Sequence, residues 1–199
     1  MWEWVYRTDW QAWATFGAGA LNAFAIFLAA RFASSKFDDW RKQRRSEKAE
    51  LILEAFYEAE EALSQVRSPM STAGEADRAR EGIEEENPTR KQIIAQVGWN
   101  RMLDRSEKWQ AIIDLLASAR VVFGTEIYTA LRNFLGARKR VEVALQMYTD
   151  IQNPIEFDRT MEADFWYIGA QNQNPPDRVS EDIESAKKQL EEALKPFID

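Results

Sequence analysis

The chain has 199 residues, of which 33 are acidic and 26 basic, giving a formal net charge of −7. It contains no cysteine and no histidine, which excludes disulfides, zinc sites of the usual kind, cysteine nucleophiles and histidine general bases. The acidic balance argues against nucleic acid as a partner. Few glycines and prolines, 8 and 6, together with 30% charged residues favour helices, so we predict an all-α chain.

The first apolar stretch has the length of a membrane span. No charged side chain occurs from Gln11 to Ala30, and about 20 helical residues, at about 1.5 Å each, match the roughly 30 Å hydrocarbon core of a bilayer. Aromatic rings favour the headgroup layer, and those at the N-terminal edge are Trp2, Trp4, Tyr6, Trp10 and Trp13. We predict a single N-terminal transmembrane helix that continues into a cytoplasmic helical bundle.

Three alternatives stay open for this stretch. A cleaved signal peptide would begin with a basic region, whereas this chain begins Met-Trp-Glu-Trp. A buried core helix, or a helix lying in the membrane interface, is compatible with the many alanines and with Asn22.

Basic residues after the apolar stretch predict its direction. Arg7 alone precedes it, and the residues that follow are Arg31, Lys36, Arg41, Lys42, Arg44, Arg45 and Lys48. By the positive-inside rule, the N-terminus lies outside a bacterial inner membrane and everything after Lys36 lies in the cytoplasm. We expect the first six of these residues, through Arg45, to bind anionic lipid headgroups.

Small or polar residues form one stripe along the predicted span. Thr15, Ala18, Asn22, Ala25 and Ala29 recur at alternating steps of three and four, and therefore share one helix face. Small residues let helices approach closely, and an amide in hydrocarbon needs a partner. We expect a homo-oligomer interface here, or a pore lining; the alternative is an alanine-rich span that tolerates one polar residue.

The chain divides into three predicted parts: residues 1–35, the aromatic segment and span; 36–68, a basic juxtamembrane segment and a long stalk-like helix; and 69–199, the rest of the bundle. The stalk-like helix has an apolar face of Ile52, Ala55, Phe56, Ala59, Ala62, Leu63 and Val66, and it ends at Ser68-Pro69.

Further helices are predicted beyond this point. A short one lies within 70–92, a long one covers 89–119, one runs from Thr125 to Asp150 after a break at Gly124, and another covers 155–169. Ser180 is expected to cap a last helix that reaches Lys195. Core candidates in 89–119 are Ile93, Ile94, Val97, Met102, Leu103, Trp109, Ile112, Ile113, Leu115 and Leu116, and Gly98 marks a weak point or a close contact.

Catalytic motifs are missing. Neither glycine-rich phosphate-binding pattern occurs, and helical di-metal sites of the Glu-x-x-His type need histidine. We therefore expect no enzyme activity, no catalytic residues, no metal and no cofactor.

One fragment, Leu131-Arg132-Asn133-Phe134-Leu135-Gly136-Ala137, resembles the first half of the motif of the HEPN superfamily of helical-bundle ribonucleases. In that family an arginine and a polar residue precede a histidine, and they act on RNA across a dimer interface. Arg132 and Asn133 match, but Ala137 stands where the histidine is most common. The resemblance implies at most a catalytically silent HEPN-like bundle; the alternative places Arg132 on a solvated helix face with Arg138, Lys139 and Arg140.

The stretch from Trp40 to Ser71, which includes Ala-Glu-Glu-Ala-Leu-Ser-Gln-Val-Arg-Ser-Pro-Met, and the overall layout resemble a bacterial family with one N-terminal span and a cytoplasmic helical domain. No activity is assigned to that family. The layout is also similar to that of single-span HEPN-like accessory proteins of CRISPR systems, which implies membrane oligomers or pores in antiviral defence. Layout does not determine function.

The leading hypothesis is therefore a membrane-anchored helical interaction or scaffold protein that forms homo-oligomers. Its expected partners are membrane lipids, further copies of the chain and an unidentified cytoplasmic protein. The alternatives are an oligomeric pore that permeabilises the inner membrane, for example in phage defence, and a degenerate HEPN-like RNA-associated protein.

Overall fold

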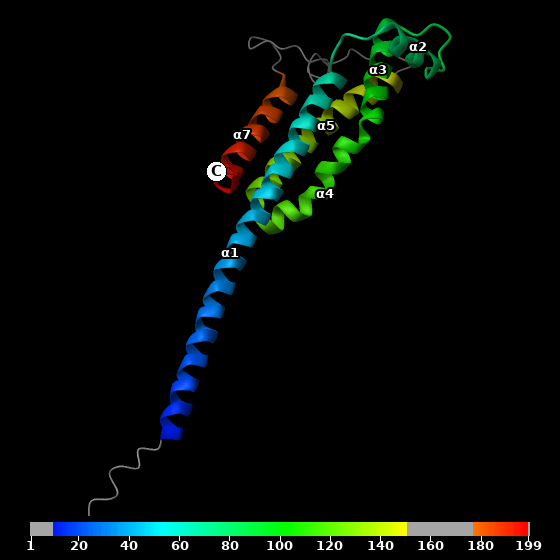
Figure 1. Ribbon diagram of the computed structural model, residues 1–199. Helices are drawn as coiled ribbons and strands as arrows, with labels where there is room; N and C mark the ends of the chain where they lie inside the picture. Colours follow the sequence, from blue (N-terminus) through cyan, green and yellow to red (C-terminus); the bar gives the residue numbers. More distant parts are fainter. Residues whose placement is uncertain (1–9, 151–176, 199) are drawn as a thin grey trace, which may run out of the picture. The chain divides into compact units, whose positions relative to one another are not determined.

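The structure, a computed structural model, describes residues 10–150 and 177–198, with side chains described for 13–147 and 177–198. Every regular element in this part is an α-helix, which confirms the all-α prediction (Figure 1). The helices are α1 Trp10–Val66, α2 Ala73–Glu81, α3 Arg90–Asp104, α4 Ser106–Phe123, α5 Thr125–Asp150 and α7 Arg178–Ile198. The chain forms two compact units, Met1–Ser46 and Glu47–Asp199.

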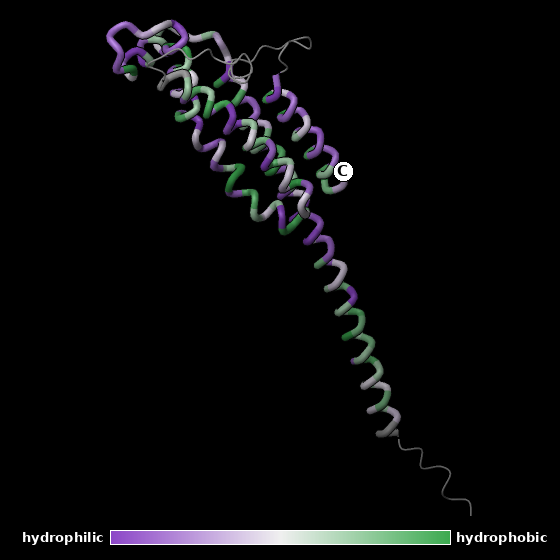
Figure 2. The backbone as a smooth tube through the Cα atoms, turned by 180° about the vertical axis from the view of Figure 1, so that it is seen from behind, coloured by the Kyte–Doolittle hydropathy of each residue, from purple (hydrophilic) through white to green (hydrophobic). Residues whose placement is uncertain are grey.

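The first unit contains the apolar half of α1. Figure 2 shows this half as the hydrophobic, green part of the helix. Within the described residues, one helix is long and apolar enough to cross a membrane, and none of its apolar window is buried. Large side chains such as Phe16, Leu21 and Ile26 are 70–72% exposed. A core helix of a soluble domain commonly buries such side chains, whereas these are exposed in the part of the chain that the structure describes.

The second unit has a core to which α1, α3, α4, α5 and α7 contribute. From Ala49 onward one face of α1 is buried, and the seven residues of its predicted apolar face all belong to this core, whereas Leu51 outside that face is 49% exposed. Phe56 of α1 meets Phe134 of α5 with 4.9 Å between ring centroids. The α5 helix also packs against α3, α4 and α7, while α2 packs against α3. Residues 36–68, expected to form a stalk, are thus divided between the two units.

The segment predicted as one helix over 89–119 is two helices. The α3 helix ends at Asp104 and α4 begins at Ser106, because Arg105 leaves helical geometry at φ −109° and ψ 19°. Across this break the indole N–H of Trp109 donates to the carbonyl of Met102 at 3.1 Å. The break lets both side chains reach the core.

Two residues assigned to that core are exposed instead. Leu103 is 53% exposed and Ile113 is 44% exposed. Their neighbours Met102 and Ile112 are buried instead. Consecutive helical residues point about 100° apart, so only one of each adjacent pair can face the core squarely.

The predicted cap of the last helix is also wrong. Asp177, three residues before Ser180, accepts a hydrogen bond from the Ser180 backbone N–H at 3.1 Å, and its carbonyl accepts one from the Glu181 N–H at 3.1 Å. The α7 helix therefore begins at Arg178 and extends to Ile198, beyond Lys195. The helix predicted over 155–169 lies outside the described residues.

Two glycines behave as the sequence suggests. Gly124 ends α4 with φ 98°, a conformation that L side chains rarely adopt, and α5 begins at the next residue. Gly98 lies in α3 at a close contact, because a Cβ there would come within 2.7 Å of Leu145 Cδ2 and 3.3 Å of the Val66 carbonyl oxygen. A side chain at position 98 would separate α3 from α1 and α5.

Candidate functional site

The small-residue stripe lies in the first unit. Its five members, Thr15, Ala18, Asn22, Ala25 and Ala29, are all exposed on α1. Their spacing places them on one face, and Gly17 and Gly19 nearby have open space where a Cβ would stand. Within the described residues nothing packs over this face, so it is accessible to a second helix.

The basic residues assigned to lipid headgroups are exposed as well. They are Arg31, Lys36, Arg41, Lys42, Arg44 and Arg45. Two of them contact aromatic rings: the Arg41 guanidinium lies 4.4 Å from the Phe37 ring centroid, and that of Arg44 lies 5.5 Å from the Trp40 centroid. The sequence predicted these basic residues as lipid contacts, but it did not predict that two of the arginines lie over these rings.

The HEPN-like fragment lies on α5. Arg132 and Asn133 are exposed, and the Arg132 guanidinium lies 6.0 Å from the Tyr128 ring centroid. Ala137 is fully buried. Residues five apart on a helix point about 140° apart, so within one chain positions 132 and 137 face different surroundings. The similarity to HEPN proteins stays a prediction.

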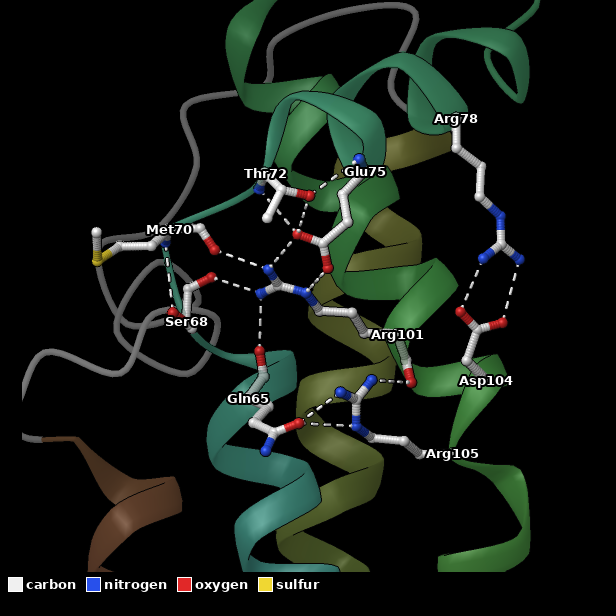
Figure 3. Close-up of polar contacts among 9 residues, drawn as sticks. All are labelled: Gln65, Ser68, Met70, Thr72, Glu75, Arg78, Arg101, Asp104 and Arg105. Carbon is white, nitrogen blue, oxygen red and sulfur yellow. Dashed lines mark hydrogen bonds and ion pairs between the residues drawn. The ribbon is translucent and has the colours of Figure 1, made fainter.

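The largest polar cluster in the described part of the chain was not predicted. It is centred on Arg101 of α3, and Figure 3 shows this side chain pointing to the end of α1 and the start of α2. Its guanidinium donates to both carboxylate oxygens of Glu75 at 2.8 and 2.9 Å. It also donates to the carbonyls of Gln65, Ser68 and Met70 at 2.8, 3.2 and 2.7 Å. We call these five residues the Arg101 network.

The Arg101 network is a structural tie. A guanidinium has five N–H donors, and the five hydrogen bonds above occupy as many protein acceptors. No donor is left for an anionic substrate. The network holds the chain between α1 and α2 against α3, where backbone carbonyls have no helical partners.

Glu75 also completes the N-terminus of α2. Thr72 and Glu75 form a capping box, in which the Glu75 carboxylate accepts from the Thr72 backbone N–H at 2.9 Å. The hydrogen bonds from Arg101, followed by that from Thr72, lower the pKa of Glu75 from its ordinary 4.5 to about 2. The pattern Thr-x-x-Glu was the available signal, since it marks helix starts in sequences.

Two more arginines reinforce this end of the bundle. Arg105 Nε donates to the side-chain oxygen of Gln65 at 3.1 Å, and Arg78 forms a two-point pair with Asp104 at 2.8 and 3.1 Å (Figure 3). The Arg78 pair is about half exposed, so it contributes little to stability.

A buried ion pair joins the end of α1 to the start of α7. Arg67 is 2% exposed. Its guanidinium donates to Asp177 Oδ1 at 2.7 Å and to Ser180 Oγ at 3.0 Å. Sequence reasoning missed this pair because 110 residues separate its partners. Asp177 therefore serves both as the cap of α7 and as the counter-ion of Arg67.

These clusters fit structural roles better than catalysis. Among the described residues, no group of three or more Asp, Glu, His or Cys side chains could hold a metal ion. Comparisons of the chain with models of protein families, with curated proteins and with solved structures give no match. In the first unit, the described surface is exposed, apolar along the stretch before Arg31 and basic after it.

Proposed function

We propose that this chain is a membrane-anchored helical interaction protein that associates with copies of itself in the inner membrane. The observation that carries this proposal is the apolar window of α1, none of which is buried. Burying apolar surface stabilises by about 25 cal/mol per Å², so a helix with this much exposed apolar surface needs a bilayer or another protein around it.

The flanking charges support one orientation. Seven basic residues follow the apolar stretch between residues 31 and 48, and Arg7 alone precedes it. Moving such a cluster across a membrane is unfavourable. In the proposed arrangement the N-terminus lies outside, and the helical unit that begins at Glu47 lies in the cytoplasm.

Self-association is proposed to use the stripe from Thr15 to Ala29. Ala18 and Ala25 let two helices approach closely, and the amide of Asn22 can hydrogen-bond to its counterpart in a second copy. Such hydrogen bonds contribute about 0.6–2 kcal/mol in membranes. This is enough to favour association through this face over association through the side of the helix that carries the phenylalanines.

The test begins with fractionation of the full chain. We expect it in the membrane pellet after high-salt and carbonate washes, and in solution only with detergent. Recovery of a soluble monomer would contradict the proposal. In detergent, cross-linking and light scattering would then report the oligomeric state.

Paired variants test the face. Ala18→Leu with Asn22→Leu changes the stripe, whereas Ala20→Leu with Ala23→Leu places two leucines on the other side of the helix. We expect the first pair to weaken cross-linking several-fold and the second to leave it unchanged. An equal loss of cross-linking in the two pairs would exclude the stripe as the interface.

A pore is the second candidate, because Asn22 is an exposed amide in the middle of an otherwise apolar helix. Polar residues within membrane helices commonly face a bundle interior or a water-filled cavity. A ring of many copies that leaks ions when expressed would favour the pore. A dimer without leakage would exclude it.

A further inference from the structure

Four exposed residues form a continuous face just after the apolar stretch of α1. Phe37, Trp40, Arg41 and Arg44 are spaced at i, i+3, i+4 and i+7, and therefore lie along one side of the helix. We call them the aromatic–arginine face. The two rings stack at 5.7 Å between centroids and are 49% and 51% exposed.

The arginines of this face point back along the helix. Arg41 lies over Phe37 and Arg44 lies over Trp40, in each case the ring four residues earlier. Helical side chains lean toward the N-terminus, and here this direction leads toward the apolar stretch. Each positive charge is therefore one turn closer to that stretch than its own backbone.

This direction brings the charges close to the lipid headgroups. With Ala30 at the end of the hydrocarbon, Phe37 lies about 10.5 Å further along and Trp40 about 15 Å, at about 1.5 Å per residue. The headgroup layer is roughly 5–8 Å thick on each side of a bilayer. The charges of Arg41 and Arg44, at the levels of these two rings, therefore lie within about one Debye length, roughly 8 Å, of that layer.

The other basic residues of the same turns lie away from the rings. Lys42 and Arg45 are about 80° or more from Phe37 and Trp40 in angle around the helix. Lys42 also follows Asp38 and Asp39 by four and three residues, so two carboxylates lie beside it. Two pairs of basic residues can be compared here, Arg41 with Arg44 and Lys42 with Arg45. Only the first pair combines positive charge with exposed aromatic surface.

We propose that the aromatic–arginine face binds the phosphodiester headgroup of an anionic phospholipid. The guanidinium groups supply paired N–H donors for phosphate oxygens, which lysine cannot match. The rings hold these groups in place and pack beside the upper part of the acyl chains. The inference rests on the proposed membrane anchoring, and it narrows six basic residues to two that determine lipid preference.

The experiment uses the full chain reconstituted in vesicles of about three parts phosphatidylcholine to one part phosphatidylglycerol. After extraction in mild detergent, mass spectrometry measures the ratio of the two lipids that copurify. We expect phosphatidylglycerol to be enriched in the wild type. Arg41→Gln with Arg44→Gln should lower this enrichment by about fivefold or more, since each basic residue near the surface contributes about 1 kcal/mol.

The matched control is Lys42→Gln with Arg45→Gln, which removes the same charge from two residues that do not lie over either ring. We expect less than half of the loss seen with the arginine pair. Equal losses would overturn the inference, because charge alone would then explain the preference. Absence of phosphatidylglycerol enrichment in a wild type that stays in the membrane would also overturn it, without affecting the proposed anchoring.

The aromatic rings have their own variant, Phe37→Ala with Trp40→Ala. We expect it to lower the enrichment although no charge changes, because the arginines lose their supports. Unchanged enrichment would contradict the role of the rings. Loss of the wild-type chain from the membrane fraction would instead contradict the proposed function itself.

Discussion

At the scale of single residues, Arg101 and Gly98 illustrate two ways in which α3 is held in the bundle. Arg101 is joined to Glu75 and to three carbonyls near the end of α1. Gly98 lies where a side chain would meet Leu145 and the Val66 carbonyl. The first contact is electrostatic and depends on pH, whereas the second is steric and does not.

The Arg101–Glu75 pair predicts a stability that falls in acid. Since the pKa of Glu75 in the folded chain, about 2, is below its ordinary 4.5, its contribution is complete above about pH 5. It is lost as the pH falls toward 2. We expect about 1 kcal/mol, because the carboxylate is 36% exposed and screening reduces the effect of the full shift.

Urea denaturation in detergent at pH 7 and pH 3 checks this expectation. Glu75→Gln should be less stable than the wild type at pH 7, and the difference should shrink at pH 3. A difference that is the same at both pH values would show that the charge of Glu75 does not matter.

Gly98→Ala is predicted to destabilise the second unit by about 1–3 kcal/mol, the usual cost of overpacking. Leu145 is 1% exposed and cannot swing away, and the Val66 oxygen belongs to the backbone. Gly136→Ala is the matched control, because a Cβ there meets nothing within 4 Å. Gly136→Ala should stabilise the second unit by up to about 1 kcal/mol, because alanine favours helix more than glycine does.

The melting temperatures of the two variants test this prediction. A Gly98→Ala variant that is more stable than the wild type would contradict the close contact at position 98.

At the scale of whole elements, α7 is tied to α1 along its length. Arg67 pairs with Asp177 at one end, and Lys187 pairs with Glu60 at 3.2 Å further along. Tyr57 donates to Glu191 at 2.7 Å, a hydrogen bond that raises the pKa of this tyrosine to about 12. These ties keep the register between two helices that lie at opposite ends of the second unit in sequence.

Of these ties, the buried pair should contribute most. Asp177→Ala leaves the Arg67 guanidinium without its counter-ion and removes the cap of α7, which we expect to cost about 3–5 kcal/mol. Arg67→Met keeps most of the volume and removes the buried charge, so its cost should be smaller. Chemical denaturation measures the free energy of unfolding of the two variants. A larger loss for Arg67→Met than for Asp177→Ala would show that the pairing with Asp177 is not what makes Arg67 important for stability.

At the scale of the whole molecule, the two units differ in what surrounds their apolar side chains. Those of the second unit are buried among α1, α3, α4, α5 and α7. In the first unit, Phe16, Phe24 and Phe32 are exposed over more than half of their surface. Among the side chains that the structure describes, the core of the second unit uses none before Ala49.

This division predicts that residues 47–199 form a folded protein without the first unit. We expect this fragment to be helical by circular dichroism, to melt cooperatively and to stay in solution without detergent, because it contains every described side chain of the core. The full chain under the same conditions should require detergent. A fragment that aggregates or fails to melt cooperatively would show that the first unit contributes to the core.

The sequence by itself determined the features that depend on local periodicity. These include the all-α class, the apolar stretch before Arg31, the buried face of α1 from Ile52 to Val66 and the break at Gly124. Each follows from a repeat or a conformational preference within a few turns of helix.

Only the tertiary structure decided the break at Arg105, the Arg101 network and the pairing of Arg67. Each of these depends on groups 7 to 110 residues apart whose meeting no local pattern encodes. The cap by Asp177 is local, since its partner Ser180 is three residues away, and an aspartate at a helix start was the available signal. Whether Leu103 or Met102 is buried follows from how α3 is rotated against its neighbours, a choice made by the packing of the whole unit.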